Sequence, residues 1–364
     1  MRIAVLVSGG VDSAVVVDLL HQEGHELTLF YIRIGMDDDE GDCAAEEDIE
    51  MCSLIASRYD LPLRIVSLHE EYWEYVMSYA LDAVKKGMTP NPDMMCNKFI
   101  KFGFFEERYG KEFDKTATGH YARVQHIDGR YYLATAEDKV KDQTDFLSAI
   151  SYQQLSHIIF PLGSMKKNQV RALAREIRLP NAQRKDSQGI CFLGKIDYRD
   201  FIKRKIGIKE GPIIEIESGR ELGKHQGHWL YTIGQRKGLG LGGGPWFIIK
   251  KDIKENILYV SKGYDTPLQY KRTIPIEKIH WISGNPFEEQ NNIGFVASGN
   301  TFEKTAVISF KIRHTPDFTK GKLILRNGTN IIESDKDIQG VAPGQFATIY
   351  TEDSDLCLGS AMII

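Results

Sequence analysis

Three short segments of the chain carry residue types that could do chemistry. The first, at residues 8–13, reads SGGVDS and lies between a short apolar run and a helical pattern. Its glycines would let the backbone approach a phosphate group, which hydroxyl groups and the amides at a helix N-terminus could then hold. The segment contains no lysine and fits neither GxxxxGK[ST] nor GxGxxG, so it is neither a Walker A loop nor a dinucleotide fingerprint. The alternative is an ordinary glycine turn with a Ser or Asp helix cap.

The other two segments each hold a cysteine. Cys96 follows Asp93 by three residues in TPNPDMMCNK. If Cys96 opens a helix, the two side chains share one face, and the helix N-terminus would lower the thiol pKa. Cys191 lies between Gly189 and Gly194, which favour a tight loop. A low-pKa thiol can carry a sulfane sulfur as a persulfide, and a second thiol can take over the S–S bond. Both cysteines could instead be buried structural residues, Cys191 more readily because its flanks are apolar.

Alternating strand-like and helix-like segments must position these residues. The apolar patterns predict a helix that ends near Gly24, further helices at 44–59 and 70–86, and strands at 3–7, 26–34, 63–68 and 115–118. Such alternation is typical of βαβ units and a parallel sheet. After about Lys205, glycines and short β runs dominate, and from about Tyr270 short strands recur at 293–296, 305–312, 323–325 and 346–350.

The chain of 364 residues is therefore expected to form three domains. We predict an α/β N-terminal domain with a parallel sheet over residues 1–204. A small, mostly-β central domain would follow over residues 205–269, and a C-terminal β-barrel over residues 270–364.

Composition narrows the class of protein. Hydrophobic residues make up 42% and charged residues 26%, which excludes a disordered chain and a disulfide-dense miniprotein. Lys and Arg number 46 against 50 Asp and Glu, a net charge of −4, so any nucleic-acid binding must come from local basic patches. No run of about 18 apolar residues predicts a membrane span. The five cysteines are odd in number and lack zinc spacing, so we expect a cytoplasmic protein in which Cys43, Cys52 and Cys357 are structural.

The SGGVDS segment resembles the PP-loop of ATP pyrophosphatases. Taken with motifs spread along nearly the whole chain, it makes the sequence similar to the tRNA-uridine 2-sulfurtransferase family, the bacterial 2-thiouridylases. The further motifs are TPNPDMMCNKFIKFG (89–103), ATGHYAR (117–123), KDQTDFL (141–147), KDSQGICFLG (185–194), GQRKGLG (234–240), APGQFA (342–347) and CLG (357–359).

This resemblance implies a reaction and its participants. The N-terminal domain would have an adenine nucleotide α-hydrolase-like fold. The enzyme would use ATP and Mg²⁺ to thiolate C2 of the wobble uridine of tRNA. Cys96 would be the nucleophile, Cys191 the persulfide carrier and Asp93 the acid/base. A persulfide-donating protein, either a sulfur relay protein or a cysteine desulfurase, would be a partner.

The resemblance also implies binding residues. Asp12 would act through Mg²⁺, and ATP would be bound by Val7, Ser8, Gly9, Gly10, Val11, Asp12, Ser13, Ala14, Tyr31 and Gly119. The target base would be contacted by Asn91, Pro92 and Asp93. Further tRNA contacts would come from His120, Lys141, Asp142, Gln143, Arg313, His314 and Gln345.

Some positions depart from the family pattern or permit a plainer interpretation. Residues 30–35 read FYIRIG where many members have a Met-Lys-Asn-Trp type run, His314 replaces a common Tyr, and the C-terminal motif continues as Ser360-Ala361. His120 could simply fill a loop, and residues 141–143 could form a solvated charged turn. Two other functions remain open. Another PP-loop AMP-forming ligase would need no paired thiols, and a non-catalytic RNA-binding module would form no AMP.

Overall fold

The computed structural model of the chain describes residues 1–35, 42–185, 198–264, 266–288, 295, 297–300, 303–326 and 329–364. Cys191 and most of the strand predicted at 293–296 lie outside these residues.

The N-terminal part of the chain forms a parallel sheet in the strand order β3-β2-β1-β4-β7. The order reverses between β1 and β4, and in open parallel sheets ligands bind at such a switch point, outside the carboxyl ends of the strands. The strands are β1 (Arg2–Leu6), β2 (Glu26–Arg33), β3 (Leu63–Ser67), β4 (Lys115–Ala117) and β7 (Ile158–Ile159).

Helices cover both faces of this sheet, because successive residues of an apolar strand point to opposite sides. Ile3 and Val5 of β1 pack in one core with α1 (Val11–Gln22), α2 (Asp42–Arg58) and α9 (Lys167–Glu176).

Ala4 and Leu6 pack in a second core on the other face, which the central domain shares. Two continuous helical segments contribute to it. The first consists of α3 (His69–Tyr72), the π-helix η2 (Trp73–Met77) and α4 (Ser78–Lys85); the second consists of α5 (Pro92–Met95), the π-helix η3 (Cys96–Phe104) and α6 (Phe105–Arg108).

The central domain is a small sheet in the order β10-β11-β8-β9, preceded by α10 (Tyr198–Ile206). Trp246, Ile248 and Leu230 of this domain belong to the same core as Ala4 and Leu6 of β1, so the two domains share buried apolar side chains. Its elements are β8 (Gly211–Glu215), β9 (Glu221–His225), η6 (His228–Leu230), β10 (Trp246–Asp252), β11 (Ile257–Lys262) and η7 (Pro267–Gln269).

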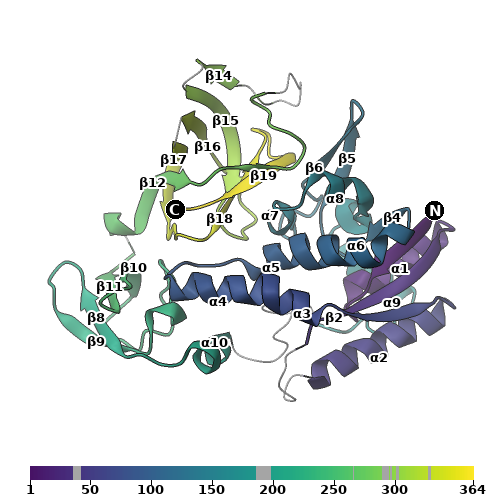
Figure 1. Cartoon of the computed structure of the whole chain (residues 1–364), viewed down its shortest axis with the longest axis horizontal. Coiled ribbons are helices and arrows are strands. Elements are labelled where there is room, and N and C mark those ends of the chain that lie inside the picture. Colours follow the sequence, from purple (N-terminus) through teal and green to yellow (C-terminus); the bar gives the residue numbers. More distant parts are fainter. Residues whose placement is uncertain are drawn as a thin grey trace.

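The C-terminal strands form a barrel in the order β12-β17-β16-β15-β18-β19, and a bridge between Ile276 and Ile363 links its two ends. Figure 1 shows this domain above the helices of the first domain, with the central sheet at lower left. The strands are β12 (Tyr270–Ile276), β13 (His280–Trp281), β14 (Ala297–Gly299), β15 (Glu303–Lys311), β16 (Thr319–Arg326), β17 (Thr329–Gln339), β18 (Phe346–Tyr350) and β19 (Leu356–Met362).

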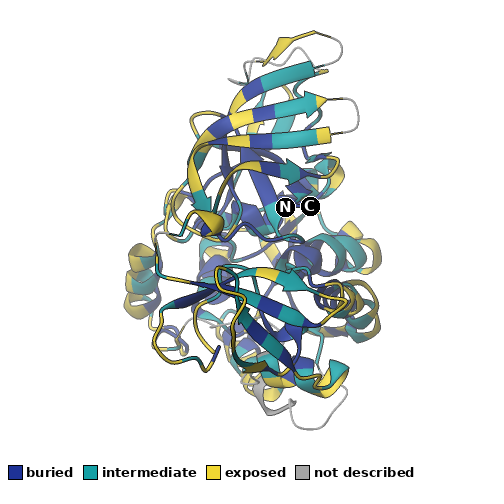
Figure 2. Cartoon of the chain, turned by 90° about the vertical axis from the view of Figure 1, so that its left-hand side faces the viewer, coloured by how far each residue is buried: buried dark blue, intermediate teal, exposed yellow. Residues whose placement is uncertain are grey.

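One hairpin crosses between the domains. The strands β5 (Arg123–Ile127) and β6 (Arg130–Ala134) come early in the chain, yet β6 pairs with β19 and extends the C-terminal sheet. After the hairpin, the chain returns to the first sheet through α7 (Thr144–Leu147) and α8 (Tyr152–His157), which lead into β7. The short helix η5 (Pro161–Ser164) follows β7. Figure 2 shows dark-blue buried segments both in the C-terminal barrel and in the domains below it, toward the middle of the molecule.

The structure confirms the predicted fold class: an α/β domain with a parallel sheet, a small central domain and a C-terminal β-barrel. The helix predicted at 70–86 is present, but it contains a π-helical segment that the apolar spacing does not reveal.

Candidate active site

The SGGVDS segment forms a tight loop between β1 and α1. Gly9 has a φ of +69°, a left-handed conformation that favours glycine. The backbone N–H of Ser8 donates to Ser13 Oγ at 3.3 Å, and that hydroxyl donates to the Gly10 carbonyl at 3.1 Å. Because β1 ends at the switch point of the sheet, the loop and the N-terminus of the 12-residue helix α1 lie where a parallel sheet binds ligands.

Gly119, which follows β4, lies against this loop. A Cβ atom at Gly119 would be 3.1 Å from the Ser13 nitrogen and 3.2 Å from Asp12 Cβ, so a side chain here would crowd the start of α1. The close approach places the backbone of Gly119 against the first turn of α1, whose amides can bind a phosphate group. The predicted ATP-binding residues of the loop and Gly119 are thus brought together. Val7 and Ala14, by contrast, are buried in the core and can offer only their backbone.

Tyr31, the other predicted nucleotide contact, lies in β2 and packs in the same core as Ile3 and Val5 of β1. It is only 9% exposed, and burial raises the pKa of its phenol, with the Asp48 carboxylate adding to the shift. The hydroxyl is therefore protonated at neutral pH and can act as a hydrogen-bond donor.

Residues that are more than 100 positions away along the chain contact the Asp12 carboxylate and the Gly9 carbonyl. Lys167 Nζ lies 2.7 Å from each carboxylate oxygen of Asp12, and the Tyr121 hydroxyl donates to Oδ1 at 3.0 Å. Asn181 Nδ2 and Arg184 Nη1 donate to the Gly9 carbonyl at 2.9 and 3.1 Å. Tyr121 lies in the ATGHYAR motif, which was the available signal, whereas the local sequence does not mark Lys167, Asn181 or Arg184 as partners of the loop.

Cys96 opens the π-helix η3, directly after α5. The side chain of Asn91 caps α5 by accepting the Met94 N–H at 3.1 Å, and Pro92 occupies the first turn. Polar, proline-rich flanks favour an accessible thiol, but Cys96 is 5% exposed and packs with Met94 and Met95 in an apolar core. Cys96 is thus buried despite these flanks, because the helix turns the hydrophobic residues and the thiol inward together.

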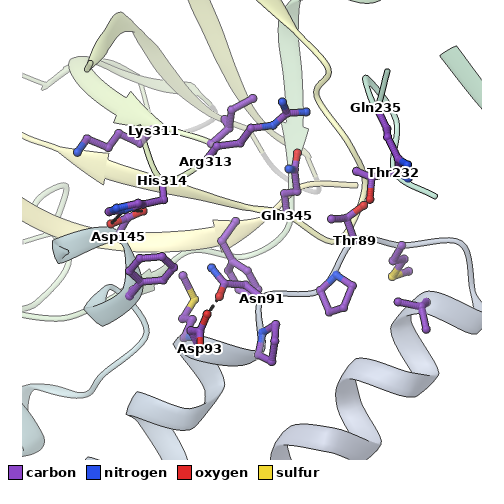
Figure 3. A pocket seen from close by; sticks show the side chains of 18 of the residues that line it. Thr89, Asn91, Asp93, Asp145, Thr232, Gln235, Lys311, Arg313, His314 and Gln345 are labelled. Carbon is purple, nitrogen blue, oxygen red and sulfur yellow. Dashed lines mark hydrogen bonds and ion pairs between the residues drawn. The ribbon is translucent and has the colours of Figure 1, made fainter. Parts of the chain in front are cut away.

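A cavity of about 460 Å³ opens beside the N-terminus of α5, and all three domains line it. Figure 3 shows Asn91 and Asp93 on one side, facing Arg313, His314 and Gln345 of the C-terminal domain. Thr232 and Gln235 of the central domain complete the wall. Six predicted substrate-binding residues therefore line one cavity: Asn91, Pro92, Asp93, Arg313, His314 and Gln345.

The predicted tRNA contact at Asp142 does not reach the cavity surface. Asp142 is 1% exposed, and its carboxylate pairs with the fully buried Lys311 at 3.1 Å and accepts from the Thr144 hydroxyl at 2.8 Å. Its charge is satisfied internally, so we expect Asp142 to support the cavity wall, and its contact with tRNA stays a prediction. Gln143 likewise turns inward and accepts the Tyr121 N–H at 2.9 Å. The alternative of a solvated charged turn is wrong for Asp142.

His120 and Lys141 do not line the cavity. The His120 ring lies beside the rings of Phe102 and Phe160, and its Nδ1 is 2.8 Å from the Thr118 hydroxyl. Burial lowers the pKa of His120 well below its usual value, and nearby Lys101 adds to the shift, so the imidazole is neutral at pH 7.

Sequence reasoning missed several residues of the cavity wall. Asp145 and Phe146 lie inside the KDQTDFL motif, which was the available signal, and they meet His314 there. His314 Nδ1 is 3.2 Å from Asp145 Oδ2, and its ring lies 4.7 Å from that of Phe146. Arg199 and Trp229 also line the cavity, and nothing in their local sequence marks them.

The remaining described cysteines fit a structural role. Cys52 and Cys357 are buried, and burial raises the pKa of both thiols, that of Cys52 to about 12. Cys43 and Cys191 have side chains outside the described residues.

A parallel sheet of this order with an SGGVDS loop at its switch point defines a HUP-type, PP-loop nucleotide-binding domain. Residues 1–195 match the family described as the tRNA methyl transferase HUP domain. Residues 199–262 match the tRNA methyl transferase PRC-barrel domain, and residues 271–363 match the aminomethyltransferase beta-barrel domain.

Curated relatives match from end to end. The tRNA-specific 2-thiouridylase MnmA of Porphyromonas gingivalis is 56% identical over 365 residues, which cover 100% of this chain and 99% of the relative. The protein of that name from Parabacteroides distasonis is 56% identical over 366 residues, with the same coverage. The chain therefore belongs to the tRNA-specific 2-thiouridylase family.

Solved structures resemble the chain only weakly. The U34-tRNA thiolase NcsA of Methanococcus maripaludis has 16% identity and a TM-score of 0.35, covering 57% of this chain and 66% of the other. A 4-thiouridine synthetase in complex with RNA and ATP has 16% identity and a TM-score of 0.33, covering 56% of this chain and 50% of the other. Likeness of this degree carries no argument about the site. Within the described ranges, no helix is both long and apolar enough to cross a membrane.

Proposed function

We propose that the protein thiolates C2 of the wobble uridine of tRNA at the expense of ATP. The observation that carries this proposal is the cavity at the N-terminus of α5, where Asn91 and Asp93 face basic and aromatic side chains from a second domain. Such a cavity suits one nucleotide turned out of a single-stranded loop, because an unstacked base can be held by polar edges and ring contacts. The PP-loop lies in the same domain and provides the site for ATP.

ATP is a substrate of this reaction, and residues 7–14, Tyr31 and Gly119 would bind it. Mg²⁺ would be held by the phosphates and by Asp12, where it would neutralise charge between the carboxylate and the phosphates. The fit is supported by the N-terminus of α1, against which Gly119 packs, and by the carboxylate of Asp12 in the first turn of that helix. Among the described residues no cluster of His, Cys, Asp and Glu forms a separate metal site.

The chain's own residues would then carry the sulfur chemistry. The uridine C2 oxygen attacks the α-phosphate of ATP, and pyrophosphate leaves, so the oxygen becomes part of an AMP leaving group. The terminal sulfur of the Cys191 persulfide attacks C2, and AMP leaves. The Cys96 thiolate then attacks the Cys191 sulfur, which forms the Cys96–Cys191 disulfide and frees 2-thiouridine. Alternatively, Cys96 first releases hydrosulfide, which attacks C2 itself. Asp93 would move protons near the base.

Partners and domain limits follow from the same proposal. A sulfur relay protein or a cysteine desulfurase would load Cys191, and the reaction would take place in the cytoplasm. The domains would comprise residues 1–204, 205–269 and 270–364. His120, Lys141, Arg313, His314 and Gln345 would contact tRNA, while Asp142 and Gln143 would support the wall of the cavity from inside.

The test is nucleoside mass spectrometry on unmodified tRNA incubated with the protein, Mg-ATP and a persulfide source. We expect 2-thiouridine only when ATP is present, and we expect its loss in Cys96→Ser and Cys191→Ser. Both substitutions remove a thiol that acts in sulfur transfer, which follows adenylation of the base. Cys191→Ser should therefore still form AMP with tRNA.

Three outcomes would overturn the assignment. Full thiolation by Cys191→Ser would remove the persulfide role of that residue. Formation of AMP that needs neither thiol nor tRNA would favour another AMP-forming ligase, and absence of AMP altogether would favour an RNA-binding module. The matched control is Cys357→Ser, which changes a buried thiol outside the proposed chemistry.

A further inference from the structure

The PP-loop contains no lysine, yet the tertiary structure brings one to it. Lys167 and Asp12 are 155 residues apart, and the Lys167 ammonium group lies 2.7 Å from both oxygens of the Asp12 carboxylate. The two side chains are 15% and 29% exposed, so the ion pair is partly accessible to solvent and is not sealed in the core.

The backbone at Lys167 is fixed from several sides. Lys167 is the first residue of α9, and its N–H donates to Asp138 Oδ2 at 2.8 Å. Val170 and Ala174 of the same helix pack in the core beneath α1. The Lys167 ammonium group also lies 5.8 Å from the centre of the Tyr121 ring. A flexible side chain on a fixed base can therefore change its partner without movement of the helix.

We propose that Lys167 binds the phosphate groups of ATP, and that its ion pair with Asp12 holds the ammonium group at the loop before Mg-ATP binds. This inference rests on the function proposed above. A carboxylate beside a triphosphate is repulsive unless a cation lies between them, and Asp12 is the residue proposed to meet Mg²⁺ there. If Mg²⁺ binds the Asp12 carboxylate, the Lys167 ammonium group would pair with the phosphates of ATP instead of with Asp12.

A second cation at the loop does not fit this role. Arg184 donates to the Gly9 carbonyl at 3.1 Å, and its guanidinium group also pairs with Asp48. Arg184 therefore stabilises the backbone of the loop, whereas Lys167 pairs with Asp12, the carboxylate that would bind Mg²⁺. Lysine suits a phosphate as a mobile point charge, which the Walker A lysine provides in other phosphate-binding loops.

The first test measures binding by calorimetry with α,β-methylene-ATP and Mg²⁺, because this analogue keeps three phosphates but cannot release pyrophosphate. We expect Lys167→Met to weaken binding at least tenfold and Lys167→Arg to restore most of it. The matched control is Lys166→Met, which removes the same charge from an exposed neighbour and should bind as the wild type does. Equal binding by Lys167→Met and the wild type would overturn the inference, as would an equal loss in Lys166→Met.

A double-mutant cycle separates phosphate binding from a merely structural ion pair. In an Asp12→Asn background, Lys167→Met should still weaken binding of the analogue several-fold, because the phosphates remain its partner. No further loss in that background would overturn the inference. Melting temperatures of all variants identify any that fail to fold. If Lys167→Met fails to fold, analogue binding by Lys167→Arg close to that of the wild type supports the inference, and loss of binding by a folded Lys167→Arg overturns it.

The proposed function can fail separately. Normal binding of the analogue by the wild type without any 2-thiouridine formation would overturn the sulfurtransferase and leave the role of Lys167 intact.

Discussion

At the residue scale, burial decides what each titratable group can do. Asp142 carries a charge in a motif typical of substrate contact, yet its ion pair with Lys311 is buried on both sides. Removing one partner of such a pair leaves an uncompensated buried charge, so we expect the pair to support the wall of the cavity. The side chain of His314, by contrast, is 41% exposed and lines the cavity together with Asp145, where a nucleotide could reach it.

A buried histidine makes stability depend on pH. Burial, and then Lys251, His225 and Lys209, lower the pKa of His228 from 6.5 to about 4. As pH falls below 6.5, the unfolded chain takes up a proton that the folded chain refuses until about pH 4. The free energy of unfolding should therefore fall by about 2 kcal/mol between pH 7 and pH 5 because of this residue alone.

The measurement compares thermal melting at pH 7 and pH 5 in the wild type and in His228→Phe. The variant should lose much less stability on acidification. His126→Phe, which replaces an exposed histidine on β5, serves as the control and should keep the wild-type pH dependence. If His228→Phe also keeps it, His228 is not the group responsible.

At the scale of elements, the π-helix η3 is the feature that sets the orientation of Cys96. A π-helix leaves some carbonyls without the partners of an α-helix, and here one side chain supplies them. Gln154 Nε2 donates to the carbonyls of Lys98 at 2.8 Å and Phe102 at 2.7 Å, and Gln154 is itself held in a capping box with Ser151. A Cβ atom at Gly103 would lie 2.9 Å from the Lys98 carbonyl, so only glycine leaves room for this arrangement.

Gln154→Leu should disturb the position of Cys96. Two carbonyls would lose their donor, at a cost of roughly 1–3 kcal/mol for each group left unsatisfied. We expect a lower turnover number for thiolation with little change in KM for tRNA, together with a lower melting temperature. Steady-state kinetics on tRNA, with Gln153→Leu as the exposed neighbouring control, would test this. A change confined to KM would argue against a role in positioning Cys96.

At the scale of the whole molecule, the candidate site exists only where domains meet. The Thr89 N–H donates to the Pro343 carbonyl at 2.8 Å, which joins the segment before α5 to the C-terminal domain. Arg313 donates to the carbonyls of Gly340 and Ile233, which joins the C-terminal and central domains. Since both joints flank the cavity, its width depends on the packing of all three domains.

Gly344→Ala should open this joint. Gly344 has a φ of +87°, and a Cβ atom there would lie 2.6 Å from Met88 Cβ and 2.9 Å from the Thr89 nitrogen. We expect at least tenfold weaker tRNA binding with unchanged binding of α,β-methylene-ATP, because the atoms nearest to that Cβ belong to Met88 and Thr89 and not to the PP-loop. Filter binding and calorimetry would measure the two affinities. Gly242→Ala is the control, since a Cβ there meets nothing within 4 Å; equal tRNA binding by both variants would refute the prediction.

Local patterns could be predicted from the sequence because they depend on neighbouring residues. Apolar runs and their spacing predicted β1 to β4 of the parallel sheet and the helical segments of α1, α2 and α3–α4, and the glycines of SGGVDS predicted a phosphate loop at a strand-to-helix junction. The motif order predicted the family and the set of cavity residues that includes Asn91, Asp93 and His314. The π-helical register at Cys96 was not predictable, because it depends on Gln154, which is distant along the chain.

The sequence by itself thus determined the class of fold, the phosphate loop and the family of the protein. Only the tertiary structure decided that Lys167 meets Asp12, that Asp142 is buried against Lys311, and that the β5–β6 hairpin joins the C-terminal sheet. The physical reason is the same in each case. Backbone conformation and apolar periodicity are set within a few residues, whereas burial and charge pairing depend on which distant surfaces pack together.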